Sequence, residues 1–98
     1  VPVRDTLKCA DDSGLVDRTV SREGLWQAQT PQLFPLGRLV ESLQAKGNGA
    51  ATDEAQAMEA IGARPRLVEG STENIKYTYP GDALLLEAVL NQQKSRLA

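Results

Sequence analysis

The balance between helices and strands most constrains the fold of this chain. Apolar residues recur at helical spacing in three segments, 35–46, 52–62 and a last one after residue 79. Each such helix needs a sheet face or another helix to cover its apolar stripe. The predicted core strands are too few to supply that face within 98 residues. The pattern therefore predicts part of a larger α/β sheet protein.

The first quarter of the sequence predicts a β-hairpin. Residues 3–8 and 15–22 are rich in Val and Thr, and the segment between them, 11–14, has the composition of a tight turn. In the second strand Arg18 and Arg22 share the face of the valines and interrupt its apolar stripe. Such a hairpin covers a core poorly and is marginally stable alone. We therefore expect an arm that reaches toward another surface.

Short strands and helices are predicted after the hairpin. A third strand, 25–29, is expected to end before a proline, which lacks a backbone donor. The helix at 35–46 is expected to stop at the glycines of 47–49. Thr52 is the expected N-cap of the second helix, and Gly62 is placed to close it.

The remaining segment is predicted to add two short strands and a helix. Residues 66–69 and 74–78 have the composition of strands. Thr78 or Tyr79 could cap the last helix, with Pro80 in its first turn. The expected inward face of this helix carries four apolar residues, which are Leu84, Leu85, Ala88 and Val89.

Composition excludes several kinds of function. One cysteine and no histidine leave nothing for a zinc site of His and Cys ligands, a Ser-His or Cys-His catalytic pair, or an internal disulfide. The Asp11-Asp12 pair lacks a third ligand to form a metal site. The net charge of −2 argues against a nucleic-acid or membrane binder, and no apolar run approaches a transmembrane helix. The lone cysteine and the lack of a leader at the start predict a cytoplasmic protein.

Five side chains are candidates for ligand binding by their chemical type. Arg22 is expected at an exposed bend, where its guanidinium can donate two hydrogen bonds to one carboxylate or phosphate. Lys76 lies near the end of a predicted strand. Thr52 stands at a helix start, and Thr6 and Thr30 add further hydroxyl groups. By position alone, a solvated charge is the commoner role of the two cations. N-capping is likewise the commoner role of Thr52.

Five sequence blocks in a fixed order narrow these possibilities. The blocks are VPVRDTLK at 1–8, REGLWQAQTPQLF at 22–34, TDEA at 52–55, LVEG at 67–70 and ENIK at 73–76. Together they resemble the C-terminal part of the 2-C-methyl-D-erythritol 4-phosphate cytidylyltransferase family, over essentially the whole chain. Cytidylyltransferases for other polyol phosphates, such as ribitol 5-phosphate, share much of the pattern.

The resemblance implies the C-terminal part of a Rossmann-like nucleotidyltransferase sheet, with a projecting β-hairpin arm that interlocks in a homodimer. Residues 1–29 would be the arm and its return strand, and residues 30–98 the α/β part that binds the acceptor substrate. The family's glycine-rich CTP loop, its catalytic arginine and lysine, and the aspartate associated with Mg²⁺ belong to an N-terminal half without counterpart here. We therefore expect no catalytic residue or metal ligand in this chain, Mg²⁺ bound chiefly through CTP, and no activity of these residues alone.

The resemblance also assigns roles to the five candidates. Thr6 and Arg22 match residues that bind methylerythritol phosphate, the arginine coming from the arm of the partner subunit. Thr30, Thr52 and Lys76 match the Thr-Pro-Gln, Thr-Asp-Glu and Asn-Ile-Lys motifs.

The implied reaction is in-line transfer of CMP from CTP to methylerythritol phosphate, in non-mevalonate isoprenoid precursor synthesis. No nucleic-acid or membrane partner is expected. Two alternatives remain open: another polyol phosphate as acceptor, and a non-catalytic dimerisation module.

Overall fold

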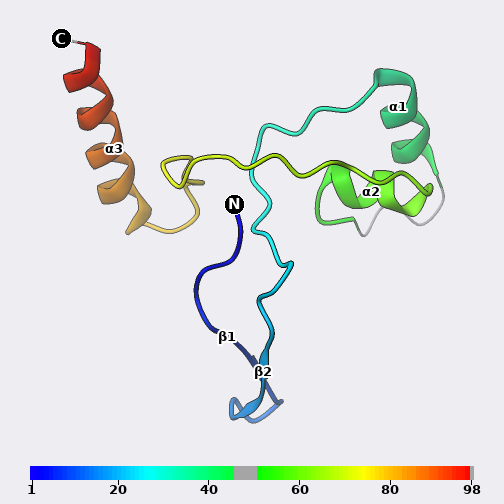
Figure 1. The fold of residues 1–98 in the computed structure, drawn as a ribbon, viewed down its shortest axis with the longest axis horizontal. Helices are drawn as coiled ribbons and strands as arrows, with labels where there is room; N and C mark the ends of the chain where they lie inside the picture. Colours follow the sequence, from blue (N-terminus) through cyan, green and yellow to red (C-terminus); the bar gives the residue numbers. More distant parts are fainter. Residues whose placement is uncertain (46–50, 98) are drawn as a thin grey trace. The chain divides into compact units, whose positions relative to one another are not determined.

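A computed structural model describes residues 1–45 and 51–97. The described chain forms two strands and three helices (Figure 1), which are β1 (Leu7–Ala10), β2 (Val16–Val20), α1 (Leu36–Gln44), α2 (Glu54–Ala60) and α3 (Asp82–Leu97). It divides into two compact units. The first unit joins Val1–Gln27 to Glu69–Ala98, and the second unit is Ala28–Val68. Each unit is described by itself below.

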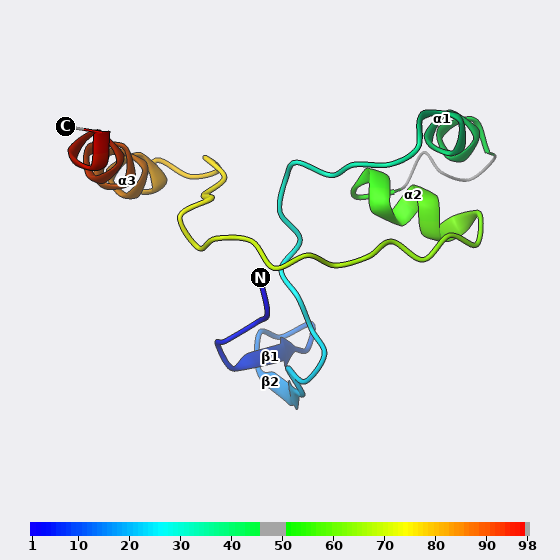
Figure 2. The same cartoon turned by 45° about the horizontal axis from the view of Figure 1, so that its top comes forward.

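The hairpin is confirmed, although its first strand starts later than predicted. Strands β1 and β2 pair antiparallel from Leu7 opposite Val20 to Ala10 opposite Val16 (Figure 2), with an irregularity after Cys9. Oδ1 of Asp11 accepts the backbone N–H groups of two turn residues, each at 2.9 Å. Because an aspartate that bonds its own backbone in this way mimics a turn, it fixes the reversal between the strands.

The predicted return strand 25–29 is wrong except for one bridge. Pro2 and Trp26 form an isolated antiparallel bridge, flanked by a bond from the N–H of Val3 to the carbonyl of Leu25 (2.9 Å). The N–H of Gln27 donates to the carbonyl of Val1 (2.8 Å). The N–H of Leu25, which would continue the ladder, instead donates to the carbonyl of Arg22 at 3.1 Å, so the pairing stops there.

In the second unit, α1 packs against α2. Helix α1 begins after Pro35 and ends at Gln44, with Ala45 as its C-cap. The last residue of the predicted helix, Lys46, and the glycines of 47–49 lie outside the described residues. Ser42 is fully buried, and its hydroxyl donates to the carbonyl of Leu39 at 2.8 Å. On α2, Ala57 and Met58 are buried. The buried side chains are mostly small, so this helix pair encloses a small core.

The N-cap of α2 is Asp53, so the prediction of Thr52 is wrong by one residue. The Asp53 carboxylate accepts the N–H of Gln56 at 2.8 Å, as an N-cap side chain does. The predicted end of the helix is confirmed at Gly62, which has φ +86° and donates its N–H to the carbonyl of Glu59 at 3.0 Å.

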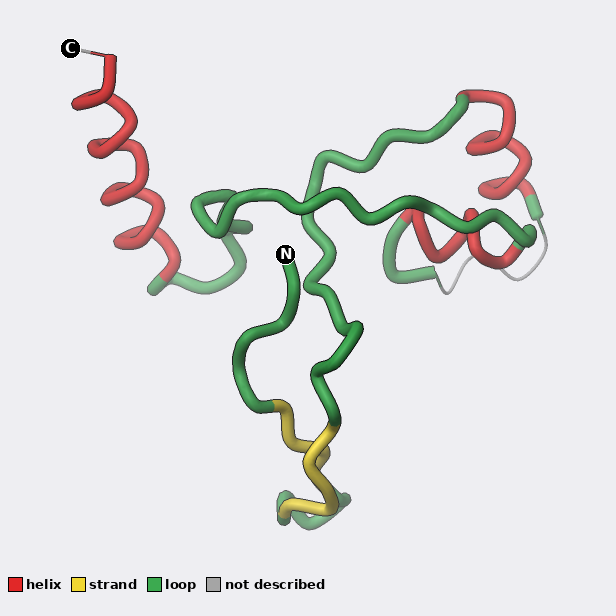
Figure 3. Tube along the Cα trace, in the orientation of Figure 1, coloured by secondary structure: helices red, strands yellow, loops and turns green. Residues whose placement is uncertain are grey.

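The predicted strands 66–69 and 74–78 are wrong in the described structure, where both segments are loop (Figure 3). The sheet of the described residues contains only β1 and β2, which pair with each other. A strand is stabilised by ladder bonds to a neighbour. Neither segment has such a neighbour among the described residues.

Helix α3 starts at a carboxylate. Oδ2 of Asp82 accepts the backbone N–H groups of Thr78 (2.9 Å) and Tyr79 (2.8 Å), so Asp82 supplies the capping side chain in place of the two predicted residues. Pro80 lies in the turn that precedes the helix, two residues before Asp82, and not in the first helical turn as predicted.

The predicted inward face of α3 is largely wrong. Leu84 and Leu85 are 74% and 55% exposed, and Ala88 is also exposed, whereas Val89 is half-buried. The side of the helix that carries Leu86 and Val89 instead lies at the loop of residues 71–75. Among the described helices and strands, none packs against α3 to the extent that α1 packs against α2.

Candidate functional site

Arg22 follows β2 and its side chain turns back toward the segment before β1. Its Nη1 donates to the backbone carbonyl of Arg4, two residues before Thr6. The side chain is exposed, and a guanidinium has five N–H donors, so the remaining donors face solvent. This contact orients the guanidinium without neutralising its charge, because a carbonyl is neutral.

Lys76 and Thr6 are also exposed and lie in the same unit as Arg22. Neither Lys76 nor Arg22 forms an ion pair with a described carboxylate, whereas three other arginines do: Arg18 with Asp17, Arg38 with Glu41, and Arg96 with Glu73. The two candidate cations therefore keep an uncompensated charge, a property that they share with other described cations, which are Arg4, Lys8, Arg64, Arg66 and Lys94.

In the second unit, Gln32 connects the segments that carry Thr30 and Thr52. Its Nε2 donates to Oδ2 of Asp53 at 3.0 Å, and its Oε1 accepts the N–H of Ala55 at 3.2 Å. These bonds hold the pKa of Asp53 below its ordinary value, through Gln32 first and the N–H of Gln56 second. The sequence analysis missed Gln32 as a functional residue. The signal that could have identified Gln32 is its position in the Thr-Pro-Gln motif, which also contains Thr30.

Thr52 belongs to the same set of bonds. Its hydroxyl and its backbone N–H both donate to Oε1 of Gln56, at 2.9 and 2.6 Å. Thr30 and Thr52 are exposed. Polar contacts thus link the segments that carry Thr30 and Thr52 within the second unit, while Thr6, Arg22 and Lys76 lie in the first.

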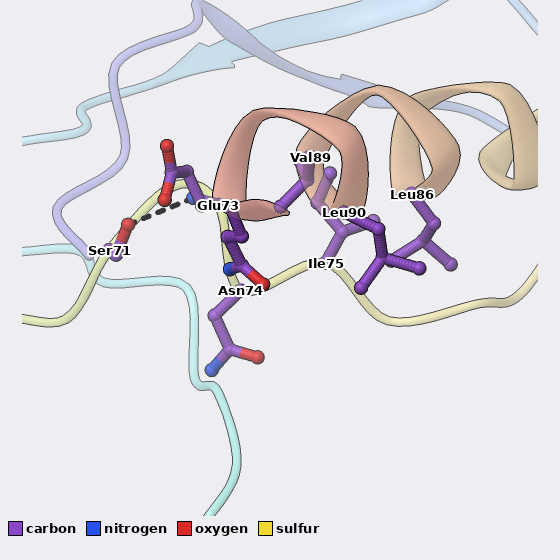
Figure 4. A pocket seen from close by; sticks show the side chains of 8 residues that line it. Ser71, Glu73, Asn74, Ile75, Leu86, Val89 and Leu90 are labelled. Atoms are coloured by element: carbon purple, nitrogen blue, oxygen red, sulfur yellow. Dashed lines mark hydrogen bonds between the residues drawn. The ribbon is translucent and has the colours of Figure 1, made fainter. Parts of the chain in front are cut away.

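A hollow of about 460 Å³ lies between α3 and the loop before Lys76 (Figure 4). Ser71, Glu73, Asn74 and Gln93 line it together with apolar Ile75, Leu86, Val89 and Leu90. The lining contains no lysine or arginine, and its one carboxylate, Glu73, pairs with Arg96 at 2.9 Å. That guanidinium lowers the pKa of Glu73. The lining therefore offers no cation to an anionic phosphate.

Metal and membrane signals are lacking in the described part of the chain. Within residues 1–45 and 51–97, no group of three or more His, Cys, Asp or Glu side chains is placed to hold a metal ion. The described helices are all too short or too polar to cross a membrane.

Comparison with known proteins confirms the resemblance. The family described as "IspD: 2-C-methyl-D-erythritol 4-phosphate cytidylyltransferase" matches residues 1–92. A protein with that name from Neisseria gonorrhoeae (strain ATCC 700825 / FA 1090) is 53% identical over 91 residues, which are 93% of this chain and 39% of the relative. One from Acidithiobacillus ferrooxidans (strain ATCC 53993 / BNL-5-31) is 55% identical over 92 residues, which are 92% of this chain and 38% of the relative.

A solved structure is similar as well. The crystal structure of 4-diphosphocytidyl-2C-methyl-D-erythritol synthase matches with a TM-score of 0.79 and 50% sequence identity, over 92% of this chain and 40% of that one. The chain therefore spans about two fifths of the length of the relatives it matches. On the extent of the family match and these identities, the chain belongs to the 2-C-methyl-D-erythritol 4-phosphate cytidylyltransferase family.

Proposed function

We propose that the protein containing this chain transfers CMP from CTP to 2-C-methyl-D-erythritol 4-phosphate, in the non-mevalonate synthesis of isoprenoid precursors. The products are 4-diphosphocytidyl-2-C-methyl-D-erythritol and pyrophosphate. The observation that carries the proposal is the family match over residues 1–92. Relatives that are half identical to the chain and bear that enzyme's name support it.

The chain supplies the acceptor side of the site. Arg22 and Lys76 hold the acceptor phosphate, and three threonine hydroxyls, those of Thr6, Thr30 and Thr52, bond to the substrate. Support comes from the exposure of all five side chains and from the uncompensated charge of the two cations. The bond from Arg22 to the carbonyl of Arg4 leaves the other guanidinium donors available for a forked contact with phosphate oxygens.

The chemistry needs no nucleophilic side chain. An oxygen of the acceptor phosphate attacks the α-phosphorus of CTP, the bond from that phosphorus to the bridging oxygen breaks, and pyrophosphate leaves with the electron pair. Catalysis is then the positioning of two anions and the neutralisation of their charge. We assign Mg²⁺ chiefly to the CTP phosphates, as the family resemblance implies.

The hairpin acts as the arm of a homodimer. Four of the five residues of β2 are exposed, and Leu15 and Val16 are 66% and 64% exposed. Apolar surface of this kind is stabilised when a second copy covers it. In the whole protein, this chain forms the C-terminal part of a Rossmann-like nucleotidyltransferase.

A pyrophosphate-release assay with the whole protein tests this function. We expect release from CTP with methylerythritol phosphate and little with ribitol 5-phosphate. Faster release with ribitol 5-phosphate than with methylerythritol phosphate would identify ribitol 5-phosphate as the acceptor, while the proposed class of reaction would stand. A folded protein that releases pyrophosphate with neither acceptor would favour a non-catalytic dimerisation module. Residues 1–98 alone should release none.

A further inference from the structure

Gln32 lies at the centre of a polar network that joins two distant parts of the sequence. Its Nε2 donates to Oδ2 of Asp53 at 3.0 Å and to the carbonyl of Gln29 at 3.4 Å. Its Oε1 accepts the N–H of Ala55 at 3.2 Å. One amide therefore holds together segments that are 21 to 23 residues apart in sequence.

The network continues from Asp53 to Thr52. The other carboxylate oxygen of Asp53, Oδ1, accepts the N–H of Gln56 at 2.8 Å. The side chain of Gln56 in turn accepts both the hydroxyl and the N–H of Thr52. A shift of Gln32 is thus transmitted along bonded groups to Thr52, and directly along the chain to Thr30, two residues away.

The geometry suits a positioning role better than a role in stability alone. Gln32 and Asp53 are half-buried, whereas Thr30 and Thr52 are exposed beside them. The amide uses both its donor and its acceptor ends, so one orientation of the side chain satisfies every bond. Hydrogen bonds to a charged group are stronger and more directional than neutral ones.

We propose that Gln32 and Asp53 are positioning residues, which fix the spacing of the Thr30 and Thr52 hydroxyls for the acceptor. The inference rests on the proposed function, in which these two threonines bind the acceptor. Neither Gln32 nor Asp53 needs to touch the substrate. Their role is to hold two hydroxyls on different segments in one arrangement before the acceptor arrives, which lowers the entropic cost of binding.

A polarity exchange in the whole protein tests the proposal. Gln32→Glu keeps the shape of the side chain and the oxygen that accepts the N–H of Ala55. It replaces the NH₂ group that faces Asp53 with a carboxylate oxygen, so that two carboxylates face each other. Asp53→Asn keeps a good N-cap but turns an NH₂ group toward the NH₂ of Gln32. In the double variant, the amide introduced at position 53 donates to the carboxylate introduced at position 32, so the bond returns with reversed polarity and an unchanged total charge. Gln44→Glu, on an exposed part of α1, is the matched control for added charge.

We expect each single variant to raise the KM for methylerythritol phosphate about tenfold or more, with the KM for CTP unchanged. The double variant should return most of the way to wild type, and Gln44→Glu should change neither KM. Rescue by the double variant excludes a simple effect of charge. Should Gln32→Glu fail to fold, Asp53→Asn and the double variant give the same comparison.

Two results would overturn the positioning role. The first is a set of variants that melt at lower temperature while the KM for the acceptor stays at the wild-type value, because the network would then be only structural. The second is a double variant no better than the worse single one. A wild-type protein without pyrophosphate release would instead reject the proposed function itself, and the positioning role with it.

Discussion

Arg22 differs from most cations of the chain in what its side chain contacts. Arg18 and Arg38 pair with neighbouring carboxylates at 3.0 Å on the exposed surface. Such pairs are screened by water and contribute little to stability. Arg22 instead bonds a neutral carbonyl across the base of the hairpin, which orients its charge and leaves that charge for an anion. This contact is the physical basis for separating Arg22 from the solvated arginines.

Arg22→Ala in the whole protein should raise the KM for the acceptor phosphate and leave the KM for CTP nearly unchanged. Losing a charge-assisted bond to phosphate costs about 1.5–3 kcal/mol, or roughly ten- to a hundredfold. Arg22→Lys should recover only part of the loss, because an ammonium cannot make a forked contact. Steady-state kinetics with each substrate varied in turn measures both constants.

Arg18→Ala and Arg38→Ala are the controls for this prediction. Each removes one exposed ion pair and should leave both KM values near those of wild type. If either control raised the KM for the acceptor as much as Arg22→Ala, the effect would come from the total charge, and the specific role of Arg22 would be rejected.

At the scale of secondary-structure elements, the sequence correctly predicted the turns and helix ends that depend on hydrogen bonds between neighbouring residues. The turn around Asp11 and the end of α2 at Gly62 were found because each depends on one residue and its near neighbours. The N-cap of α2 was misplaced by one position. Thr and Asp are both good caps, and here Asp53 is also held by Gln32, 21 residues away.

Elements that depend on distant partners could not be predicted from the sequence. Segments 66–69 and 74–78 have strand composition, but a strand needs a neighbour, and the described chain supplies none to either. The same reason explains α3, where Leu84 and Leu85 were expected to face inward and are exposed. For the candidate site, residue types and motifs predict five side chains whose roles stay predictions, whereas the network of Gln32 required the structure.

Gly62→Ala should destabilise the protein by about 1 kcal/mol or more, through backbone strain alone. Gly62 has φ +86°, a conformation that alanine adopts with difficulty, yet an added Cβ would have no atom within 4 Å. Gly37→Ala is the matched control, since its Cβ is also unobstructed but lies within α1 at an ordinary φ. That change should be neutral or slightly stabilising. Equal losses in urea unfolding for both variants would contradict this account.

Asp82 should make the start of α3 sensitive to acid. The N–H of Tyr79 first, and that of Thr78 second, lower the pKa of Asp82 below its ordinary value of 3.8. The charged carboxylate therefore stabilises the folded state above the ordinary pKa, and this contribution is lost as pH falls through the lower folded pKa. The difference in unfolding free energy between wild type and Asp82→Asn should be constant near neutral pH and shrink below pH 3.8. A difference that grew on acidification would refute this role.

At the scale of the whole molecule, the exposed hairpin predicts association. Leu15 and Val16 expose most of their surface. Strands β1 and β2 pack against each other, and no other described helix or strand packs against them to a comparable extent. The whole protein should therefore sediment as a dimer at micromolar concentration. Val16→Glu, which places a charge on this surface, should shift the dimer toward monomer. A wild-type protein that sediments as a monomer would reject the arm as a dimer contact.

Mixing Arg22→Ala with Lys76→Ala, at an acceptor concentration too low for either variant alone to turn over, can decide whether Arg22 serves the site of its own subunit or that of the partner. If Arg22 acts across the dimer and Lys76 within its own subunit, a dimer of one Arg22→Ala and one Lys76→Ala subunit contains one intact site and one site lacking both side chains. Random exchange makes half of the dimers mixed, so about one quarter of the wild-type activity should return. If Arg22 acts within its own subunit, every site lacks one cation and no activity returns. Exchange is verified first with differently tagged subunits, so that an inactive mixture with confirmed mixed dimers rejects action across the dimer.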